Sequence, residues 1–508
     1  MNLLLVIPFL VPLVGAAVTL LLRRTPRAQQ AASVLVLAAV VVDAALLLAK
    51  TAGGTVATSQ AGAWEAPLGI TIVADALSAL LVLVSSVVLL VVLLYAIGQD
   101  IGGLSRAMPQ VFHPIYLVLT AGVCLSFLAG DLFNLFVGFE VMLTASYALI
   151  TQAPTRARVR ASMIYTVVSL TSSILFLTGV ALVYGLTGTV NMADIAEKLG
   201  AAPEELRMVL ALLFLVVFGI KSALVPMHFW LPDSYPVAIT RISAIFAALL
   251  TKVAVYAIIR SQTLLFGRDD ISAVLLWMAI ATMIVGILGA LVQDDINRVV
   301  AFTLVSHIGY MIFGLGLNTV AGIAGVVIYL VHHIVVQASL FLVNGLIRQY
   351  VGHTSLRAVR GLTTVSPALA LFFLLPAMSL AGLPPMSGFV AKVALFKAGI
   401  EAGGWLVYLG VVAGVLTSLL TLMAIFRIWV RGFWGTPMPD MVEARAQLRS
   451  GSSRAGLRFT TAMTGVMVGV GITVAVMAGP LTDIAFTAAR ELLDPSAYID
   501  AVLQKGPS

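Results

Sequence analysis

Residues 363–396 read TTVSPALALFFLLPAMSLAGLPPMSGFVAKVALF, a long apolar stretch with a single charged residue, Lys392. The stretch exceeds the roughly 20 residues that a helix needs to cross a bilayer. Its middle is the sequence LPPMSG at 383–388. Proline removes a helix hydrogen bond, and such an interruption at membrane depth persists only where protein or water satisfies the backbone. The stretch therefore predicts a membrane-spanning helix, the twelfth of the chain, that is broken near its middle.

The rest of the chain has the same apolar character. Of its 508 residues 61 % are hydrophobic and 10 % are charged, against about 25 % charged in a soluble domain; the mean hydropathy is +1.08. A backbone in lipid must satisfy its own hydrogen bonds, so apolar stretches of about 20 residues predict helices rather than barrel strands. We expect an all-α polytopic membrane protein of about fourteen transmembrane helices. They are expected at 2–22, 31–50, 72–97, 112–130, 132–151, 162–186, 208–229, 238–259, 273–292, 299–317, 322–347, 363–396, 405–426 and 460–485.

A second interruption lies in the seventh expected helix, which contains Pro226 and runs into HFWLP at 228–232. The two broken helices are five spans apart. Discontinuous helices at corresponding places in two halves of a chain are typical of inverted-repeat transporters. We therefore expect four parts: a three-helix segment at 1–110, two inverted five-helix repeats at 111–262 and 263–428, and a linker with the fourteenth helix at 429–508.

Basic residues are distributed unevenly over the expected loops. Of the 29 Lys and Arg, 18 fall in loops on one side, 7 in loops on the other, and four lysines lie inside helices. Because cytoplasmic loops are enriched in Lys and Arg, we expect both termini to face outside. The net charge of +7 comes from scattered residues without a basic run, so nucleic acid is not an expected partner.

The chain contains one cysteine, Cys124. One thiol can form neither an internal disulfide nor a Cys-ligated iron–sulfur cluster, and the sequence has no CxxCH haem motif and no phosphate-binding loop. We therefore expect no cofactor. Any redox reaction or ATP hydrolysis coupled to this protein must take place in a partner.

Charged residues inside the expected helices are the candidate functional residues. Each costs about 2.5–3.5 kcal/mol on insertion scales if it faces lipid, so these side chains should face the bundle. Glu140 and Lys221 lie mid-helix at similar depth. A carboxylate and an ammonium on separate helices could pair and separate during transport. The alternative is a fixed salt bridge that only selects helix packing.

Two further lysines, Lys252 and Lys392, have no obvious partner nearby in the sequence. Burial disfavours the charged form of a lysine, so both could lose and regain a proton, as a proton relay requires. The alternative is that these side chains extend to the membrane surface, which is the interpretation we favour for Lys397 near the end of its helix.

Three acidic residues have weaker assignments. Asp75 and Asp131 lie at the beginning of expected helices, where a carboxylate suits the helix N-terminus, so we expect helix-start or interface roles. Asp43 lies inside the second expected helix without a named partner. An interface with another subunit is one explanation for it.

Histidines are the other candidates for proton transfer. His307, His332 and His333 lie in the tenth and eleventh expected helices, where imidazole could carry protons between lysines. The alternative is that they are hydrogen-bonded core residues. His228, beside the break of the seventh helix, could gate a water path or bind freed carbonyls. No metal site is expected, because no carboxylate or third histidine lies near His332 and His333.

Several of these motifs together resemble the proton-pumping antiporter-like subunits that respiratory complex I shares with Mrp cation/proton antiporters. The motifs are Glu140, Lys221, HFWLP at 228–232, Lys252, SHIGY at 306–310 and GLPPMSGFVAK at 382–392. The resemblance covers most of the chain. Within that superfamily, GDLFNLFVGFEVMLTASYAL at 130–149 and the lysine at 392 resemble the D-type subunits of Mrp-type Na⁺/H⁺ antiporters, whereas the complex I homologue carries glutamate at the latter position.

The resemblance implies a proton-translocating subunit of a multi-subunit Na⁺/H⁺ antiporter in the bacterial cytoplasmic membrane. The implied partners are other membrane subunits of an Mrp-type complex, with protons and Na⁺ as transported ions. The implied proton relay consists of Glu140, Lys221, Lys252, His332, His333 and Lys392. The residues with a possible relay or gating role are His228, His307, Gln337, Pro226, Pro384 and Pro385.

One position departs from the family pattern. Relatives commonly carry His followed four residues later by Lys in the eleventh helix, whereas here Gln337 follows His333. A neutral amide can form hydrogen bonds but cannot carry a charge, so the histidines or water must take over that step.

Two other functions stay open at this point. The first is a subunit of complex I or of a membrane-bound hydrogenase, with the same relay but energy from electron transfer in neighbouring subunits. The second is a structural scaffold whose buried charges only dock partner subunits. In the expected function the chain is a secondary-transporter subunit rather than an enzyme.

Overall fold

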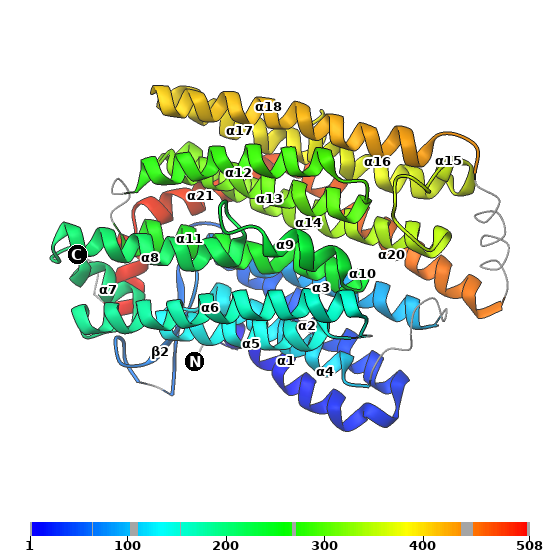
Figure 1. The fold of residues 1–508 in the computed structure, drawn as a ribbon. Helices are drawn as coiled ribbons and strands as arrows, with labels where there is room; N and C mark the ends of the chain where they lie inside the picture. The colour runs from blue at the N-terminus through cyan, green and yellow to red at the C-terminus, as the bar shows by residue number, and fades with distance from the viewer. Residues whose placement is uncertain are drawn as a thin grey trace.

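The computed structural model describes residues 3–62, 64–101, 110–152, 154–266, 271–437 and 451–504. The described chain is almost entirely helical, and most helices lie side by side along one direction (Figure 1). Up to residue 266 the helices are α1 (Leu3–Leu21), α2 (Pro26–Thr51), α3 (Ala76–Ile101), α4 (Phe112–Leu128), α5 (Leu132–Ile150), α6 (Arg156–Thr187), α7 (Met192–Leu199), α8 (Glu204–Ser222), α9 (Trp230–Ser234), α10 (Thr240–Ile245) and α11 (Thr251–Arg260).

From residue 271 onward the helices are α12 (Ser272–Val292), α13 (Ile296–Gly316), α14 (Val320–Val351), α15 (Leu362–Val365), α16 (Pro367–Ala381), α17 (Ser387–Ala402), α18 (Trp405–Ile428), α20 (Gly451–Val476), α21 (Ala478–Leu493) and α22 (Ser496–Leu503). Short helical turns of other types are η1 (Leu22–Arg24), η2 (Tyr235–Val237), η3 (Phe246–Leu250), η4 (Ser261–Leu265) and η5 (Trp429–Phe433). By length and composition, eleven helices of the described chain could cross a membrane. Each of the expected fourteen ranges falls largely on helix, and the number that crosses a bilayer stays a prediction.

Polar side chains begin many of these helices. The first orphan N–H groups of a helix need an acceptor, which Ser, Thr, Asn or Asp at the N-cap supplies. The helices α5, α6, α7, α13, α14 and α16 are capped in this way by Asp131, Thr155, Asn191, Asp295, Thr319 and Ser366. Each helix therefore begins at a residue that its own sequence specifies.

The structure corrects the sequence analysis at the end that carries α7 and α22. Strands β1 (Ala57–Ala61) and β2 (Ile70–Ala74) form an antiparallel hairpin that was not expected, with Ala57 opposite Ala74. The eighth expected helix continues beyond residue 259 through Leu265, so the prediction that placed Arg260 in a loop was wrong. The last expected helix is interrupted at Met477 and continues to Leu493. Residues 438–450 of the expected linker lie outside the described residues.

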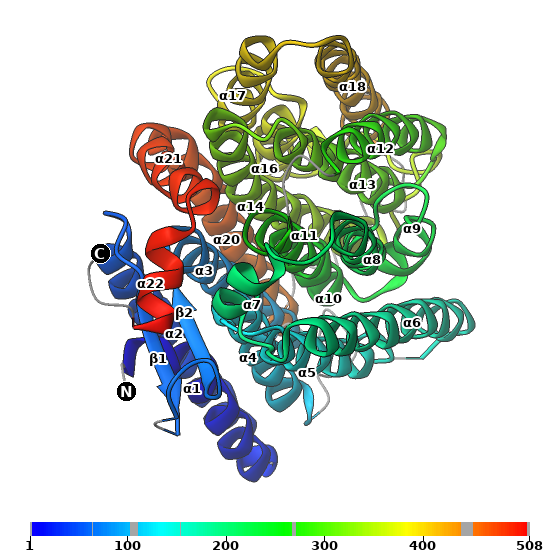
Figure 2. The same ribbon diagram turned by 90° about the vertical axis from the view of Figure 1, so that its left-hand side faces the viewer.

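Helix α14 occupies the middle of the bundle. Its membrane-length window is entirely buried, and it packs against α13, α17, α20, α21 and α3. Figure 2 looks along the bundle from the end with α7 and α22, and it shows α1 and α18 at opposite edges with α14 between them. The side chains in this window of α14 are therefore covered by neighbouring helices.

The two broken helices contain the same local turn. Helix α8 ends at Ser222, and Ala223 follows in the left-handed conformation with φ of 63°. Helix α16 ends at Ala381, and Gly382 follows with φ of 87°. A leucine comes next in both places, and a proline follows the left-handed residue by three positions, Pro226 or Pro385. Both helices therefore break at the positions that the prolines in the sequence predict.

A second matched feature is a close helix pair in each half. An added Cβ at Gly122 of α4 would lie 2.5 Å from the backbone N of Met142 of α5, and one at Gly286 of α12 would lie 2.5 Å from the N of Ser306 of α13. Only glycine permits such backbone contact. The division into repeats at 111–262 and 263–428 stays a prediction, and these two matches agree with it.

Candidate functional site: a buried polar path

The first part of the site joins three helices through one serine. The Ser173 hydroxyl on α6 donates to Glu140 Oε1 on α5, and Lys221 Nζ on α8 donates to Ser173 Oγ at 3.0 Å. Lys221 is 7 % exposed, and its Nζ lies 5.2 Å from the centre of the Phe139 ring. The acid and the lysine are therefore brought together, as expected, but a hydroxyl that the sequence analysis missed bridges them in the described structure.

The break after α8 is stabilised by neutral groups. Trp230 Nε1 donates to the carbonyl of Ile220 at 2.9 Å, and Val225 N donates to Thr282 Oγ1 at 3.2 Å. Pro226 and His228 lie in the half-buried to exposed segment between Val225 and Trp230. Freed backbone groups at membrane depth need such partners. The indole thus leaves the Lys221 ammonium available for Ser173.

Lys252 lies on α11 directly after a widened helical turn. Its side chain has no exposed surface, and its Nζ donates to the carbonyl of Ala247 in η3. Such π-type turns free carbonyls from the regular helical pattern and are frequent at functional sites. A small cavity extends from Lys221 past Tyr165 and Trp230 to Leu250, two residues before Lys252. The cavity therefore runs from Lys221 toward the turn that precedes Lys252.

Two histidines on different helices follow Lys252. The rings of His307 on α13 and His333 on α14 are stacked, with centroids 5.4 Å apart. His307 Nδ1 lies 2.8 Å from the hydroxyl of Tyr329, and His333 Nε2 lies 3.1 Å from the Gln337 amide. Both Lys252 and Lys392 lie within electrostatic range of these histidines. Gln337 therefore lies in the path as a hydrogen-bonding group.

His332 connects α14 to the second broken helix. Its Nδ1 lies 2.9 Å from Ser387 Oγ and 3.4 Å from Ser379 Oγ, and the two serine oxygens are 3.1 Å apart. Ser379 precedes the break and Ser387 follows it. An added Cβ at Gly388 would lie 2.8 Å from the His332 ring, so a glycine is needed for this approach.

Lys392 ends the path at the second break. Its Nζ donates to the carbonyls of Leu380 and Ala381, each at 2.9 Å, and lies 5.2 Å from the centre of the Tyr310 ring. These are the carbonyls that the break frees at the end of α16. Pro384 and Pro385 lie between them and α17. By contrast, Lys397 is exposed, with its Nζ 3.8 Å from Glu401, which fits the surface role expected of it.

The sequence analysis considered charged residues and histidines, and it missed the short polar groups that connect them. The connecting groups are Ser173, Tyr310, Tyr329, Ser379, Ser387 and Thr421. Serine and tyrosine are common in membrane helices, so their types alone gave no signal. The one indication lay at the second break, because Ser387 is part of the LPPMSG motif itself.

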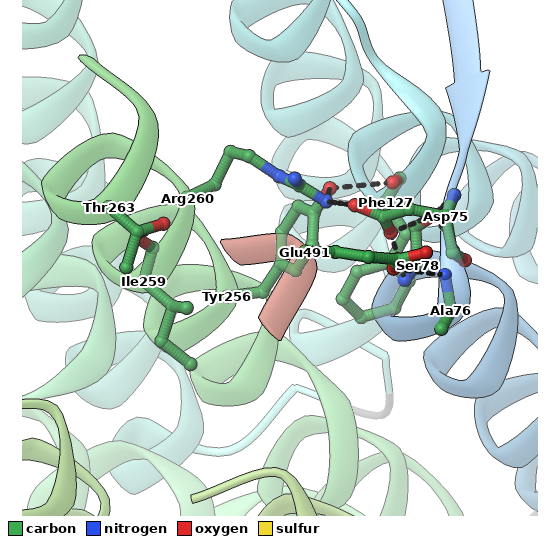
Figure 3. A network of polar contacts seen from close by, with 9 residues as sticks. All are labelled: Asp75, Ala76, Ser78, Phe127, Tyr256, Ile259, Arg260, Thr263 and Glu491. Carbon is green, nitrogen blue, oxygen red and sulfur yellow. Dashed lines mark hydrogen bonds and ion pairs between the residues drawn. The ribbon is translucent and has the colours of Figure 1, made fainter. Parts of the chain in front are cut away.

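A separate polar cluster lies at the hairpin end (Figure 3). Asp75 accepts a hydrogen bond from Ser78 N at the start of α3, as expected of a helix-start residue, and it also forms a buried ion pair with Arg260 at 2.5 Å. Tyr256 donates to the carbonyl of Phe127, and Glu491 of α21 accepts from Ala76 N at 3.1 Å. This ion pair was missed because its members are far apart in sequence.

The other acids are placed more simply. Asp131 caps α5 by accepting from Asn134 N at 2.6 Å, as expected of a helix-start residue. Asp43 is buried on α2, and neither of its oxygens has a hydrogen-bond partner among the described residues. Nowhere in the described ranges does a group of three His, Cys, Asp or Glu residues lie close enough to hold a metal ion.

The chain was compared with known families and proteins. The family model described as "NADH:quinone oxidoreductase/Mrp antiporter, TM" matches residues 129–421. The Na(+)/H(+) antiporter D subunit of Alkalihalophilus pseudofirmus is 40 % identical over 447 residues, which cover 87 % of this chain and 88 % of that protein. The protein of the same name from Bacillus subtilis is 36 % identical over 460 residues, covering 89 % of each.

A solved structure gives the same picture in three dimensions. A chain of the Mrp complex from Dietzia sp. superimposes with a TM-score of 0.89 at 32 % identity, covering 99 % of this chain and 100 % of that one. The similarity therefore includes the helices outside residues 129–421 as well as those within them.

Proposed function

Because the chain belongs to the NADH:quinone oxidoreductase/Mrp antiporter family, we propose that it is the proton-translocating subunit of a multi-subunit Na⁺/H⁺ antiporter. It works in the bacterial cytoplasmic membrane with other membrane subunits, and both of its termini face outside. The observation that carries the proposal is the path from Glu140 to Lys392, where lysines and histidines from five helices follow one another inside the bundle. Intramembrane charges of this kind mark proton pathways.

The proton relay runs from the Glu140–Ser173–Lys221 group through Lys252 and the histidines to Lys392. When Lys221 separates from the serine and the acid, its positive charge acts more strongly on Lys252 and favours loss of the Lys252 proton. Unit charges 4 Å apart interact by about 4 kcal/mol even at an effective dielectric constant near 20. Each proton transfer therefore changes the charge state of the next group.

The membrane potential supplies the energy in this function. It is worth about 2.3 kcal/mol per charge for each 100 mV, and proton entry drives cation export in the assembled complex. A subunit of complex I would use the same path with energy from electron transfer. The antiporter function is supported by the 40 % and 36 % identity to proteins named as antiporter subunits over nearly the whole of both chains. The chain is then a transporter subunit rather than an enzyme.

The test is ΔpH-driven exchange in everted membrane vesicles from an antiporter-deficient strain that makes the whole complex. We expect Glu140→Ala and Lys392→Ala to abolish Na⁺-dependent proton flux at matched expression and assembly. Ser173→Ala should reduce the flux, because a hydrogen bond to a charged group is worth about 1.5–3 kcal/mol. The matched control is Lys397→Ala, an exposed lysine on the same helix α17.

Three outcomes would count against the proposal. Normal flux in the Lys392→Ala complex would show that the relay is not used. Loss of assembly in both variants, with flux per assembled complex unchanged, would favour the scaffold function. Flux that depends on a quinone reductant rather than on ΔpH would favour the complex I function.

A further inference from the structure

A basic cleft opens at the end of the bundle opposite the hairpin. It lies between the start of α6, the start of α13 and the end of α14, and it encloses ≈ 1040 Å³ of empty space counted out to open solvent. Because α6 runs from this cleft to α7, the cleft and the hairpin are at opposite ends of the bundle (Figure 1). The path from Glu140 to Lys392 uses none of the residues that line it.

The lining of the cleft is positively charged. Its charged and titratable residues are Arg158, Arg298, Arg348, His353 and Asp295. The single acid is engaged elsewhere, because Asp295 caps α13 and accepts a hydrogen bond from Thr354 Oγ1 at 2.6 Å. Three arginines and one acid thus line a concave surface. Arginine is suited to phosphate because its planar donors match phosphate oxygens.

The three arginines differ in how they are held. Arg158 Nε donates to the carbonyl of Val237 at 3.1 Å, and Arg298 pairs with Asp233 at 3.0 Å. Arg348 is exposed at the end of α14, where its backbone carbonyl accepts from Gly352 N; among the described residues its guanidinium has no hydrogen bond or ion pair. One arginine of the cleft therefore has its full donor set available to a ligand.

An apolar surface continues from the cleft along α6. Val159, Met163 and Val167 follow Thr155, which lines the cleft, at four-residue spacing and are 46 %, 63 % and 62 % exposed. Residues at this spacing share one helix face. A free phosphate would use only the arginines, whereas a phospholipid would use the charged cleft and the apolar face together. Basic pockets between membrane helices bind anionic headgroups in this way.

From this arrangement we propose that the cleft is a binding site for an anionic phospholipid. The headgroup phosphate lies against Arg348 with Arg298 and Arg158 around it, and an acyl chain follows the face of α6 formed by Val159, Met163 and Val167. The site is independent of the proton path and of the function proposed above.

Native mass spectrometry of the purified full chain in neutral detergent tests the proposal, with phosphatidylglycerol and phosphatidylcholine titrated separately. Phosphatidylglycerol should bind more tightly. Arg348→Gln should weaken its binding about fivefold, which corresponds to about 1 kcal/mol for one basic residue near an anionic surface. Arg348→Lys should restore most of the binding. The matched control Arg360→Gln, an exposed arginine on the loop after α14 outside the cleft, should bind like the unmodified chain.

Each other outcome overturns part or all of the proposal. Equal affinity for the two lipids, or equal loss in Arg348→Gln and Arg360→Gln, would show that the cleft is not selective. Displacement of phosphatidylglycerol by millimolar inorganic phosphate would assign the site to free phosphate instead of lipid. Because the Arg348 guanidinium is exposed, both glutamine variants should keep the thermal unfolding temperature of the unmodified chain, and this measurement separates lost binding from lost folding.

Discussion

The two broken helices have the same turn but satisfy their freed carbonyls differently. After α8, the carbonyl of Ile220 accepts from the neutral indole of Trp230, and Lys221 bonds to Ser173. After α16, the carbonyls of Leu380 and Ala381 accept from the ammonium of Lys392 itself. One lysine lies beside a break that another residue stabilises. The other lysine stabilises the break.

Because of this difference, the backbone at the α8 break does not depend on the charge of Lys221. The backbone at the α16 break does depend on the charge of Lys392. Trp230 does not titrate, so the α8 break keeps its hydrogen bond whatever the charge of Lys221. The charged Lys392 ammonium donates charge-assisted hydrogen bonds to the two α16 carbonyls, whereas the neutral amine would donate weaker ones. Loss of a proton from Lys392 should therefore loosen the α16–α17 break, whereas loss of a proton from Lys221 should leave the α8–α9 break intact.

Replacing the two lysines by methionine should show the largest difference. Both variants should lose transport, but Lys392→Met also leaves two buried carbonyls without a donor, at about 1–3 kcal/mol each. Lys221→Met should change stability much less. Lys392→Gln, whose amide can still donate, should recover much of the stability without transport. The measurements are proton flux in vesicles and thermal unfolding in detergent; equal destabilisation of the two methionine variants would refute the contrast.

Trp230→Phe should remove the donor that stabilises the α8 break, as removal of Lys392 would do at the α16 break. The ring volume is largely kept, but the carbonyl of Ile220 loses its donor, which should cost about 1–3 kcal/mol. Because no charge is removed, the dependence of flux on pH should keep its shape while thermal stability falls. A shifted pH profile with unchanged stability would show instead that the indole acts on Lys221. The control is Trp405→Phe, an exposed tryptophan at the start of α18.

The smallest effects should come from the left-handed residues, with opposite signs at the two breaks. Gly382→Ala should destabilise by about 1–2 kcal/mol, the cost of this conformation for a residue with a Cβ, and the added Cβ would lie 2.8 Å from Lys392 Cδ. Ala223→Gly removes the same strain and should stabilise by up to a similar amount. Thermal unfolding of both variants checks this, and a change of the same sign in both would contradict it.

The sequence predicted the breaks well because their cause is local. Proline and glycine act on the backbone within a few residues, so Pro226 and the LPPMSG motif marked the α8 and α16 breaks directly. Hydropathy predicted the helices for the same reason. The charged members of the path were also visible, because a charge in an apolar stretch is costly wherever the helix lies.

What the sequence did not predict depends on contacts between distant segments. The eighth expected helix ended at 259 because Arg260 was assigned to a loop, yet Asp75 neutralises it from 185 residues away and the helix continues. Ser173 became part of the site only because α6 carries it between α5 and α8. The widened turn η3 before Lys252 likewise has no signature in its apolar sequence.

The ion pair of Asp75 and Arg260 also bears on how the chain is made. Tyr498 of α22 lies with its ring 5.2 Å from the Arg260 guanidinium, and Glu491 binds the backbone beside Asp75. Helices α21 and α22 leave the ribosome after every other described helix. Until these helices are made, the pair between the start of α3 and the end of α11 lacks both contacts. A chain truncated before α21 should therefore hold this buried ion pair less firmly than the full chain does.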